Sequence, residues 1–262
     1  MNKITRRLSS TLITDVYDCH CHIIDPRFPL IANQGYLPPF FTCDEYRNTV
    51  ASLSIRSGAI VSGSFQGYDQ TYLIASLKQL SSWIGVVQVR HNIKDEEIIS
   101  LNAAGVRACR FNLFRGSNSN LDDIIRLANR CYNLVGWHAE FYIDSSTIHK
   151  DHIKSLSKLH KFSIDHLGMS GKGLQALLEL VDAGAKVKAT GFGRVDMDIP
   201  LVLEAIASKN QNCLMFGTDL PSTRAKRPFK ADDIDLIIKV LGNEISRKVF
   251  WSNAIDFYKP NL

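Results

Sequence analysis

The stretch Asp15-Val-Tyr-Asp-Cys-His-Cys-His-Ile-Ile24 decides the fold prediction, because it supplies the first strand of a repeating strand–helix pattern. Side chains of alternate strand residues point to the same face, so we expect Asp18, His20 and His22 to lie together. Two imidazoles at this spacing can converge on one metal ion or on one substrate oxygen. The stretch alone leaves open a second interpretation, in which both histidines are hydrogen-bonded core residues.

Outward from this strand, short β-branched runs alternate with amphipathic segments. Seven further strands are predicted at residues 59–62, 83–89, 106–114, 137–144, 162–167, 186–192 and 213–220. Helices are predicted at residues 71–80, 94–104, 121–134, 148–159, 173–183, 199–208, 231–241 and 245–257, the last being an extra C-terminal helix. Eight strands alternating with helices predict an α/β fold, the (β/α)₈ TIM barrel. A doubly wound sheet is the alternative, but no glycine-rich dinucleotide motif follows an early strand.

Residues 25–46 are too long for a simple connection, and they carry four prolines, at positions 26, 29, 38 and 39. In a barrel this segment is expected to be a long loop after strand one that covers the active face. The whole chain, residues 1–262, is then expected to form a single domain.

The composition is that of an ordinary globular protein, with 45% hydrophobic and 22% charged residues. The net charge of +5 is dispersed, so a nucleic-acid partner is not expected. No apolar run suits a signal peptide or a membrane span. Six cysteines without a CxxC pair favour reduced thiols and a cytoplasmic protein, whose oligomeric state the sequence does not indicate.

Barrel enzymes carry their active sites at the carboxyl ends of the strands. In this sequence, polar and titratable side chains are concentrated at those ends. Polar residues that only made hydrogen bonds in a core would not be expected at the same end of so many strands. They are His20 and His22 on the first strand, Asn112 on the fourth, Tyr142 on the fifth, His166 on the sixth, Arg194 after the seventh and Asp219 on the eighth.

The order of these motifs resembles the amidohydrolase superfamily, and more closely its amidohydrolase 2 branch, which includes 2-pyrone-4,6-dicarboxylate lactonases and sugar lactonases. The matching stretches are residues 18–22, 67–69, 105–112, 136–138, 164–168, 186–191 and 216–221. The chain departs from the pattern at Ser62-Gly63-Ser64, where relatives carry Gln-Pro-Ser. It departs again at Leu220-Pro221-Ser222, where relatives carry Trp-Pro-His. Both changes touch the pocket, so the resemblance bears on reaction class more than on substrate identity.

The fourth strand limits the number of metal ions. A binuclear site needs a bridging carboxylate or modified lysine there, and this strand offers Arg110 and Asn112 instead. A guanidinium repels a cation, so at most one divalent metal is expected. Zinc would suit the ligand set His20, His22, His166 and Asp219. Because the lactonases that the chain resembles work without a bound metal, no required cofactor is the first expectation.

The expected catalytic residues are Asp219, His20, His22 and His166. Asp219 is expected to be the general base that activates water, although it could instead cap the following helix. The three histidines would polarise a carbonyl and stabilise its oxyanion, directly or through a metal.

The expected substrate-binding residues are Arg110, Arg194, Tyr142, Asn112 and Ser64. A guanidinium can bind a carboxylate through two hydrogen bonds. Arg115 is a further candidate for this role, although a surface salt bridge is an equally reasonable interpretation of that residue. The resemblance implies that Tyr142 contacts substrate. Glu140 is expected to pair with His138 as support for the barrel.

These residues favour a hydrolase that opens a small carboxylated or polyhydroxylated lactone, with an anionic small molecule as the partner. A mononuclear zinc amidohydrolase or decarboxylase acting on a small cyclic acid is the second hypothesis. The third is a barrel that binds a small anion without turning it over.

Overall fold

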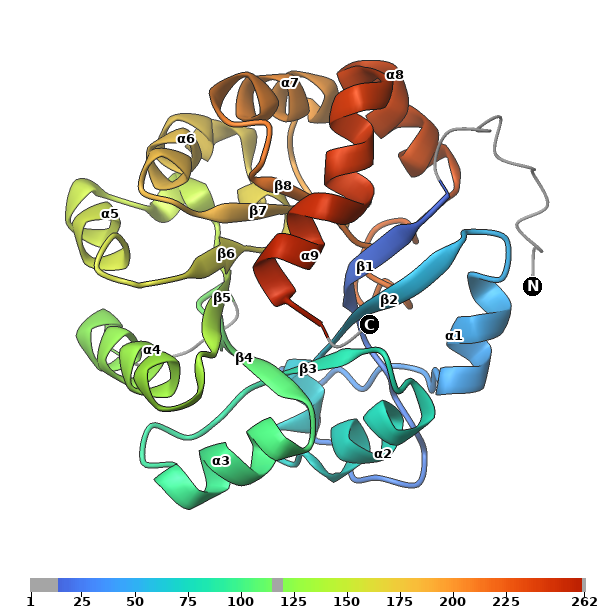
Figure 1. Cartoon of the computed structure of the whole chain (residues 1–262), viewed down its shortest axis with the longest axis vertical. Helices are drawn as coiled ribbons and strands as arrows, with labels where there is room; N and C mark the ends of the chain where they lie inside the picture. The colour runs from blue at the N-terminus through green and yellow to red at the C-terminus, as the bar shows by residue number, and fades with distance from the viewer. Residues whose placement is uncertain (1–13, 115–119, 261–262) are drawn as a thin grey trace.

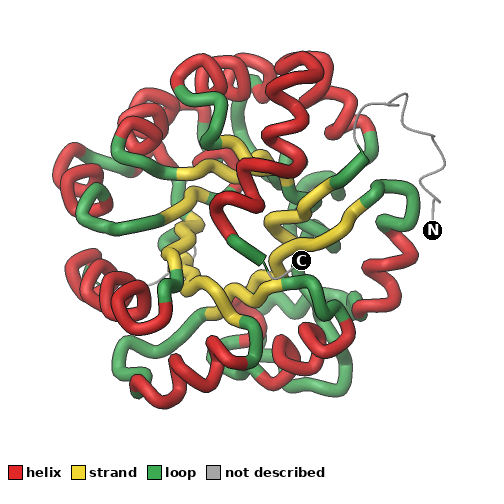
Figure 2. The backbone as a smooth tube through the Cα atoms, in the orientation of Figure 1, coloured by secondary structure: helices red, strands yellow, loops and turns green. Residues whose placement is uncertain are grey.

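The computed structural model describes residues 14–114 and 120–260, so the candidate Arg115 lies outside the described residues. Within those ranges eight parallel strands form one sheet in chain order, and helices surround it as an outer ring (Figures 1 and 2). The strands are β1 (Val16–Cys21), β2 (Ile55–Val61), β3 (Ile84–Val87), β4 (Val106–Asn112), β5 (His138–Tyr142), β6 (Phe162–Ile164), β7 (Lys186–Ala189) and β8 (Leu214–Phe216). The predicted (β/α)₈ TIM barrel is therefore confirmed.

The helices match the predicted segments within a few residues, apart from the two ends of the chain. They are α1 (Cys43–Thr49), α2 (Thr71–Gln79), α3 (Asp95–Ala103), α4 (Leu121–Val135), α5 (Lys150–Leu156), α6 (Leu174–Asp182), α7 (Ile199–Lys209), α8 (Asp232–Arg247) and α9 (Asn253–Tyr258). Helix α1 was not predicted. Its capping box, in which Thr42 and Glu45 bond reciprocally, starts a helix inside the segment expected to be loop. At the other end α8 runs on to Arg247 across a kink at Gly242.

The barrel closes between its first and last strands just beyond β8. There the N–H of Asp219 donates to the carbonyl of His20, and the N–H of His22 donates to the carbonyl of Leu220, both at 2.7 Å. These two bonds bring the turn after β8 against the end of β1, which is where the candidate site residues were predicted.

The opposite end of the barrel is covered by α9 (Figure 1). Phe257 and Tyr258 pack on Tyr17 and on apolar residues of several strands, and these form an inner core distinct from the outer core between strands and helices. All six cysteines are free and buried. Within the described residues no helix is long and apolar enough to cross a membrane.

The structure corrects the expectation that Asp18 shares a face with the two histidines. The pairing of β1 with β2 shifts register between Asp18 and Cys21, and such a bulge reverses the facing of the side chains that follow it. The carboxylate of Asp18 instead accepts hydrogen bonds from the Tyr46 hydroxyl of α1 and from Thr218.

Candidate active site

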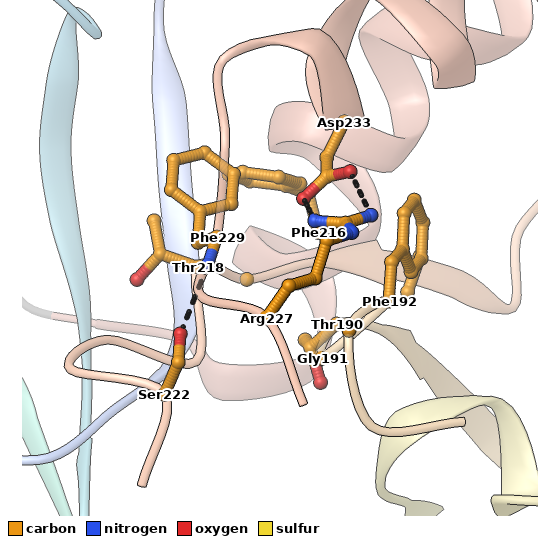
Figure 3. A pocket seen from close by; sticks show the side chains of 12 residues that line it. Thr190, Gly191, Phe192, Phe216, Thr218, Ser222, Arg227, Phe229 and Asp233 are labelled. Atoms are coloured by element: carbon orange, nitrogen blue, oxygen red, sulfur yellow. Dashed lines mark hydrogen bonds and ion pairs between the residues drawn. The ribbon is translucent and has the colours of Figure 1, made fainter. Parts of the chain in front are cut away.

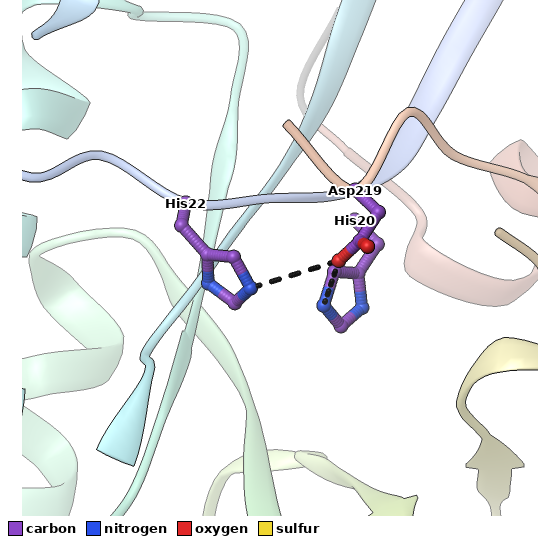
Figure 4. A group of neighbouring side chains, drawn as sticks. All are labelled: His20, His22 and Asp219. Carbon is purple, nitrogen blue, oxygen red and sulfur yellow. Dashed lines mark ion pairs between the residues drawn. The ribbon is translucent and has the colours of Figure 1, made fainter. Parts of the chain in front are cut away.

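Three imidazoles and one carboxylate meet at the carboxyl end of the barrel, and Figure 4 shows two of the rings with the carboxylate. The Nε2 atoms of His20 and His22 lie 3.9 Å from Oδ1 of Asp219, and Nε2 of His166 lies 4.0 Å from it. All four side chains are buried. The structure thus brings together all four residues expected to be catalytic.

Backbone geometry in two turns aims these side chains. His166 and Asp219 have φ values of 51° and 58°, and this left-handed region is rare for residues with a side chain and concentrated at functional sites. Strands β6 and β8 end before these residues, so the expectation that both lie on strands was wrong. Because β6 and β8 end before these residues, the backbone turns there, and the side chains of His166 and Asp219 can lie across the carboxyl end of the barrel.

The two oxygens of Asp219 have different surroundings. Oδ2 accepts from Nε of Arg194 at 2.7 Å and lies 2.5 Å from Nη2 of the same guanidinium. Arg194 is held in place by a bond to the carbonyl of Thr223. Oδ1 is buried and has no hydrogen-bond partner among the described residues. Two nitrogens of the guanidinium hold Oδ2, and Oδ1 is left as an acceptor that faces the rings.

Hydrogen bonds behind the rings decide which nitrogens face Asp219. Nδ1 of His22 lies 2.7 Å from the carbonyl of Val61, which can only accept, so the proton is on Nδ1 and Nε2 presents a lone pair. Nδ1 of His166 bonds the Thr190 hydroxyl at 2.6 Å. Burial lowers the pKa values of His22 and His166 well below 6.5, and both rings are therefore neutral at pH 7.

This arrangement fits one metal ion. Nε2 of His22 and Oδ1 of Asp219 are two acceptors that face each other across 3.9 Å, and two lone pairs so placed are stabilised by a cation or by a water that donates to both. His20, His22 and Asp219 form a compact group of potential ligands, and nitrogen and oxygen donors of this kind suit zinc.

A pocket opens above the rings of His22 and His166. It is lined by His22, Gly63, Ser64, Phe65, Arg110, Asn112, Tyr142, His166, Arg194, Thr223 and Arg224. All five residues expected to bind substrate are therefore at the pocket, and three of the lining side chains are guanidinium groups. Arg224 was not predicted, because it lies in the irregular segment after β8 where no periodic pattern marks its direction.

Segment 25–42 contacts the rim of this pocket. The Arg224 guanidinium bonds the carbonyl of Asn33 and stacks 4.5 Å from the centre of the Tyr36 ring. The amide of Asn33 donates to Ser64, and the N–H of Ile31 donates to the carbonyl of Phe65 at 2.7 Å. The predicted covering loop thus lies at the pocket and is tied to its walls.

Arg110 has a second set of contacts inside the barrel. Its Nε donates to Asp165 at 2.9 Å and its Nη1 donates to the carbonyl of Ser62 at 3.2 Å. The guanidinium also lies 5.1 Å from the centre of the Tyr142 ring. Arg110 therefore supports the barrel in addition to lining the pocket.

Below the rings lies a group of buried charges that sequence reasoning identified only in part. The pair His138–Glu140 is present, with 3.0 Å between Nε2 and Oε1. Lys188 and Asp165 join it, with Lys188 Nζ 2.5 Å from Glu140 and 3.2 Å from Asp165. Lys188, which stands between Val187 and Ala189 in β7, was the signal that could have pointed to this group.

A second pocket lies beside the ends of β7 and β8 (Figure 3). Its charged residues are paired with each other, since Arg227 makes two bonds to Asp233. The hydroxyl of Ser222 accepts from the N–H of Phe229. None of the three histidines lines it, so we assign the chemistry to the pocket above the rings.

Known proteins match this chain over nearly its whole length. The model of the Amidohydrolase family matches residues 17–259. A 2-pyrone-4,6-dicarboxylate hydrolase of Comamonas testosteroni is 28% identical, and the match covers 93% of this chain and 90% of that protein.

Solved structures with the same fold are similar over nearly their full length. A protein of Agrobacterium tumefaciens has a TM-score of 0.82 at 20% identity, covering 93% of this chain and 95% of that one. A protein of Acinetobacter baumannii, described as a probable 2-pyrone-4,6-dicarboxylic acid hydrolase, has a TM-score of 0.80 at 18% identity, covering 93% and 99%.

Proposed function

Because the chain belongs to the amidohydrolase family, we propose that it hydrolyses the ester bond of a small lactone that carries one or more carboxylate groups. One observation carries this proposal: Oδ1 of Asp219, which has no hydrogen-bond partner in the described part of the chain, faces three imidazoles, and two of these rings line a pocket together with three arginines. The name of the Comamonas testosteroni relative, a hydrolase of a cyclic dicarboxylate ester, points to the same substrate class.

Asp219 is the general base in this proposal. A water beside Oδ1 gives its proton to the carboxylate, and its oxygen adds to the ring carbonyl carbon. Arg194 keeps Asp219 aimed at the rings, since it holds the other oxygen. The tetrahedral intermediate then collapses with cleavage of the ring carbon–oxygen bond, and the proton on Asp219 passes to the leaving oxygen. The products are a carboxylic acid and a hydroxyl group, or its keto tautomer.

The arginines account for the carboxylated substrate. Arg194 and Arg224 present guanidinium groups to the pocket, and Arg110 does so from its place beside Asp165. A carboxylate bound by such groups gains charge-assisted hydrogen bonds that a neutral sugar lactone lacks. Ser64, Asn112 and Tyr142 are proposed to orient the ring.

A mononuclear zinc enzyme of the same family remains the second candidate, because of the facing acceptors on His22 and Asp219. His20, His22, His166 and Asp219 would hold the ion. When bound, zinc supplies an activated water and a polarised carbonyl.

A panel of pyrone carboxylates and sugar lactones, assayed by acid release with a pH indicator, tests the proposal. We expect hydrolysis of carboxylated lactones that persists after treatment with a chelator. Loss of activity on chelation and recovery with zinc would establish the second candidate. Carboxylates that raise the melting temperature while no lactone is opened would replace both with a binding function.

A further inference from the structure

Lys188 is enclosed inside the barrel and contacts side chains from three other parts of the chain. Its Nζ lies 2.5 Å from Oε2 of Glu140, 3.2 Å from Oδ1 of Asp165 and 3.3 Å from Nδ1 of His20. The lysine side chain is fully buried, as are both carboxylates. Nothing in the proposed reaction uses this lysine.

The charges around Lys188 keep it an ammonium ion. Glu140 and Asp165 are two carboxylates, and they balance the charges of Lys188 and Arg110. Glu140 is further held by the Tyr258 hydroxyl at 2.9 Å. A buried ammonium between two carboxylates remains protonated, and an ammonium has three protons to donate and no lone pair to accept one.

This donor fixes the role of one nitrogen of His20. Because an ammonium only donates, Nδ1 of His20 accepts the bond from Lys188, and a neutral imidazole then carries its proton on Nε2. The competing group is Asp165, whose Oδ1 lies 3.5 Å from the same Nδ1. The lysine contact is the shorter of the two at 3.3 Å, and it has hydrogen-bond geometry, which the contact with Asp165 lacks.

We propose that Lys188 is a positioning residue that holds His20 in the Nε2-protonated tautomer. The three rings around Asp219 are then not equivalent. His22 presents a lone pair to the carboxylate, and His20 presents an N–H to the same region from 3.9 Å. In the metal-free protein His20 is thereby a hydrogen-bond donor for a substrate oxygen, and it would become a metal ligand only if its proton moved from Nε2 to Nδ1. This inference goes beyond the proposed function, because it concerns the tautomer of His20 in the protein without bound substrate.

The tautomer can be measured in the wild-type protein without any substrate. Two-bond ¹⁵N–¹H correlation spectra of ¹⁵N-histidine-labelled protein at pH 7.5 distinguish the Nε2-H, Nδ1-H and doubly protonated forms. The His20 resonances are identified by their absence in a His20→Asn variant. The Nε2-H pattern supports the proposal, and an Nδ1-H or doubly protonated pattern overturns it.

A pair of lysine variants tests whether Lys188 is the cause. Lys188→Met removes the donor, leaving Asp165 to accept from Nδ1 and turning the Nε2 lone pair toward the site. Zinc affinity, measured by competition with a chromophoric chelator, should then rise by about 10- to 100-fold. Hydrogen-bond partners of a metal-ligating side chain change metal affinity over this range. Lys186→Met is the matched control, since Lys186 lies on the same strand and bonds the carbonyl of Asn212.

Unchanged zinc affinity and an unchanged His20 tautomer in folded Lys188→Met protein would overturn the proposal, as would an equal rise in the Lys186→Met control. If Lys188→Met does not fold, the wild-type spectrum still tests whether His20 carries its proton on Nε2. Neither measurement depends on lactone hydrolysis, so a failure of the proposed function is seen separately.

Discussion

Asp18 shows how one buried carboxylate can hold a site together without taking part in its chemistry. It accepts from the N–H and hydroxyl of Thr218, from the Tyr46 hydroxyl and from the N–H of His20, at 2.6 to 3.1 Å. It therefore joins β1, α1 and the turn that carries Asp219. Burial outweighs these four bonds and raises the pKa of Asp18 to about 6.

Replacing Asp18→Ala should destabilise the protein by at least about 3 kcal/mol, because several buried donors lose their acceptor at once. Urea unfolding measures this. Asp15→Ala is the control: Asp15 lies next to the same strand, its side chain is 43% exposed and it bonds Arg56 on the surface, so its loss should cost less than about 0.5 kcal/mol. Equal losses in the two variants would show that Asp18 does not organise this junction.

Arg224 tests carboxylate recognition with less disturbance of the barrel than Arg110, whose removal would also take away one of the two cationic partners of buried Asp165. Arg224→Met should raise KM for carboxylated lactones by about 10- to 150-fold, equivalent to about 1.5–3 kcal/mol. Neutral sugar lactones should be much less affected. Arg90→Met is the control, since Arg90 is exposed and stacks on Tyr68 away from the pocket. A similar rise in KM for neutral and carboxylated lactones would contradict the assignment.

At the scale of elements, strand–helix alternation was predictable because burial on both faces of a parallel sheet produces apolar runs that helices separate. The ends of the strands were not. The predicted strand 213–220 ends as β8 at Phe216, because Asp219 adopts a left-handed turn that no apolar periodicity reveals. His166 was misplaced for the same reason. Both residues were nevertheless found by their polarity, since a titratable group after an apolar run marks a strand end.

Other site features depend on contacts between distant parts of the chain. The bulge in β1 turned Asp18 away from the histidines. The ion pairs of Lys188 with Asp165 and Glu140 connect β7 to the end of β6 and to β5. A sequence pattern specifies neighbours along one element, so neither could be read from it.

The last helix, α9, is expected to stabilise the barrel through a hydrogen bond. The Tyr258 hydroxyl donates to Glu140 inside the barrel. Tyr258→Phe should therefore lower the free energy of unfolding by about 1–3 kcal/mol, because the bond is to a buried charged group. The control is Tyr68→Phe, at a side chain that is 52% exposed, where thermal and urea unfolding should change little. Unfolding curves for Tyr258→Phe that match the wild type would show that α9 covers the barrel without anchoring it.

For the whole molecule, the buried histidines predict how stability changes with pH. Desolvation lowers the pKa values of His20, His22 and His166, and it lowers the pKa of His138 to about 4. Below pH 6.5 the unfolded chain binds protons that the folded chain does not. The stability contributed by these groups is thus complete above pH 6.5 and falls as the pH falls. Asp18, with its raised pKa, acts in the opposite direction between pH 6 and 3.8 but is a single group.

We therefore expect the free energy of unfolding to decrease from pH 7 to pH 5, by up to about 1.4 kcal/mol per pH unit for each histidine that stays neutral in the fold. Urea titrations at half-unit intervals measure the slope. His138→Gln should reduce it, since one of the contributing groups is gone. A flat or increasing stability over this range would contradict the assignment of neutral buried rings.

The central claim is that Asp219 activates water for lactone hydrolysis, and its most direct test is the turnover of the Asp219→Asn variant on the best carboxylated lactone. The amide keeps the shape of the side chain but cannot take the proton, so kcat should fall by about 10²- to 10⁴-fold. KM and the melting temperature should change much less. A folded Asp219→Asn protein that opens the lactone at near wild-type rate would contradict the account.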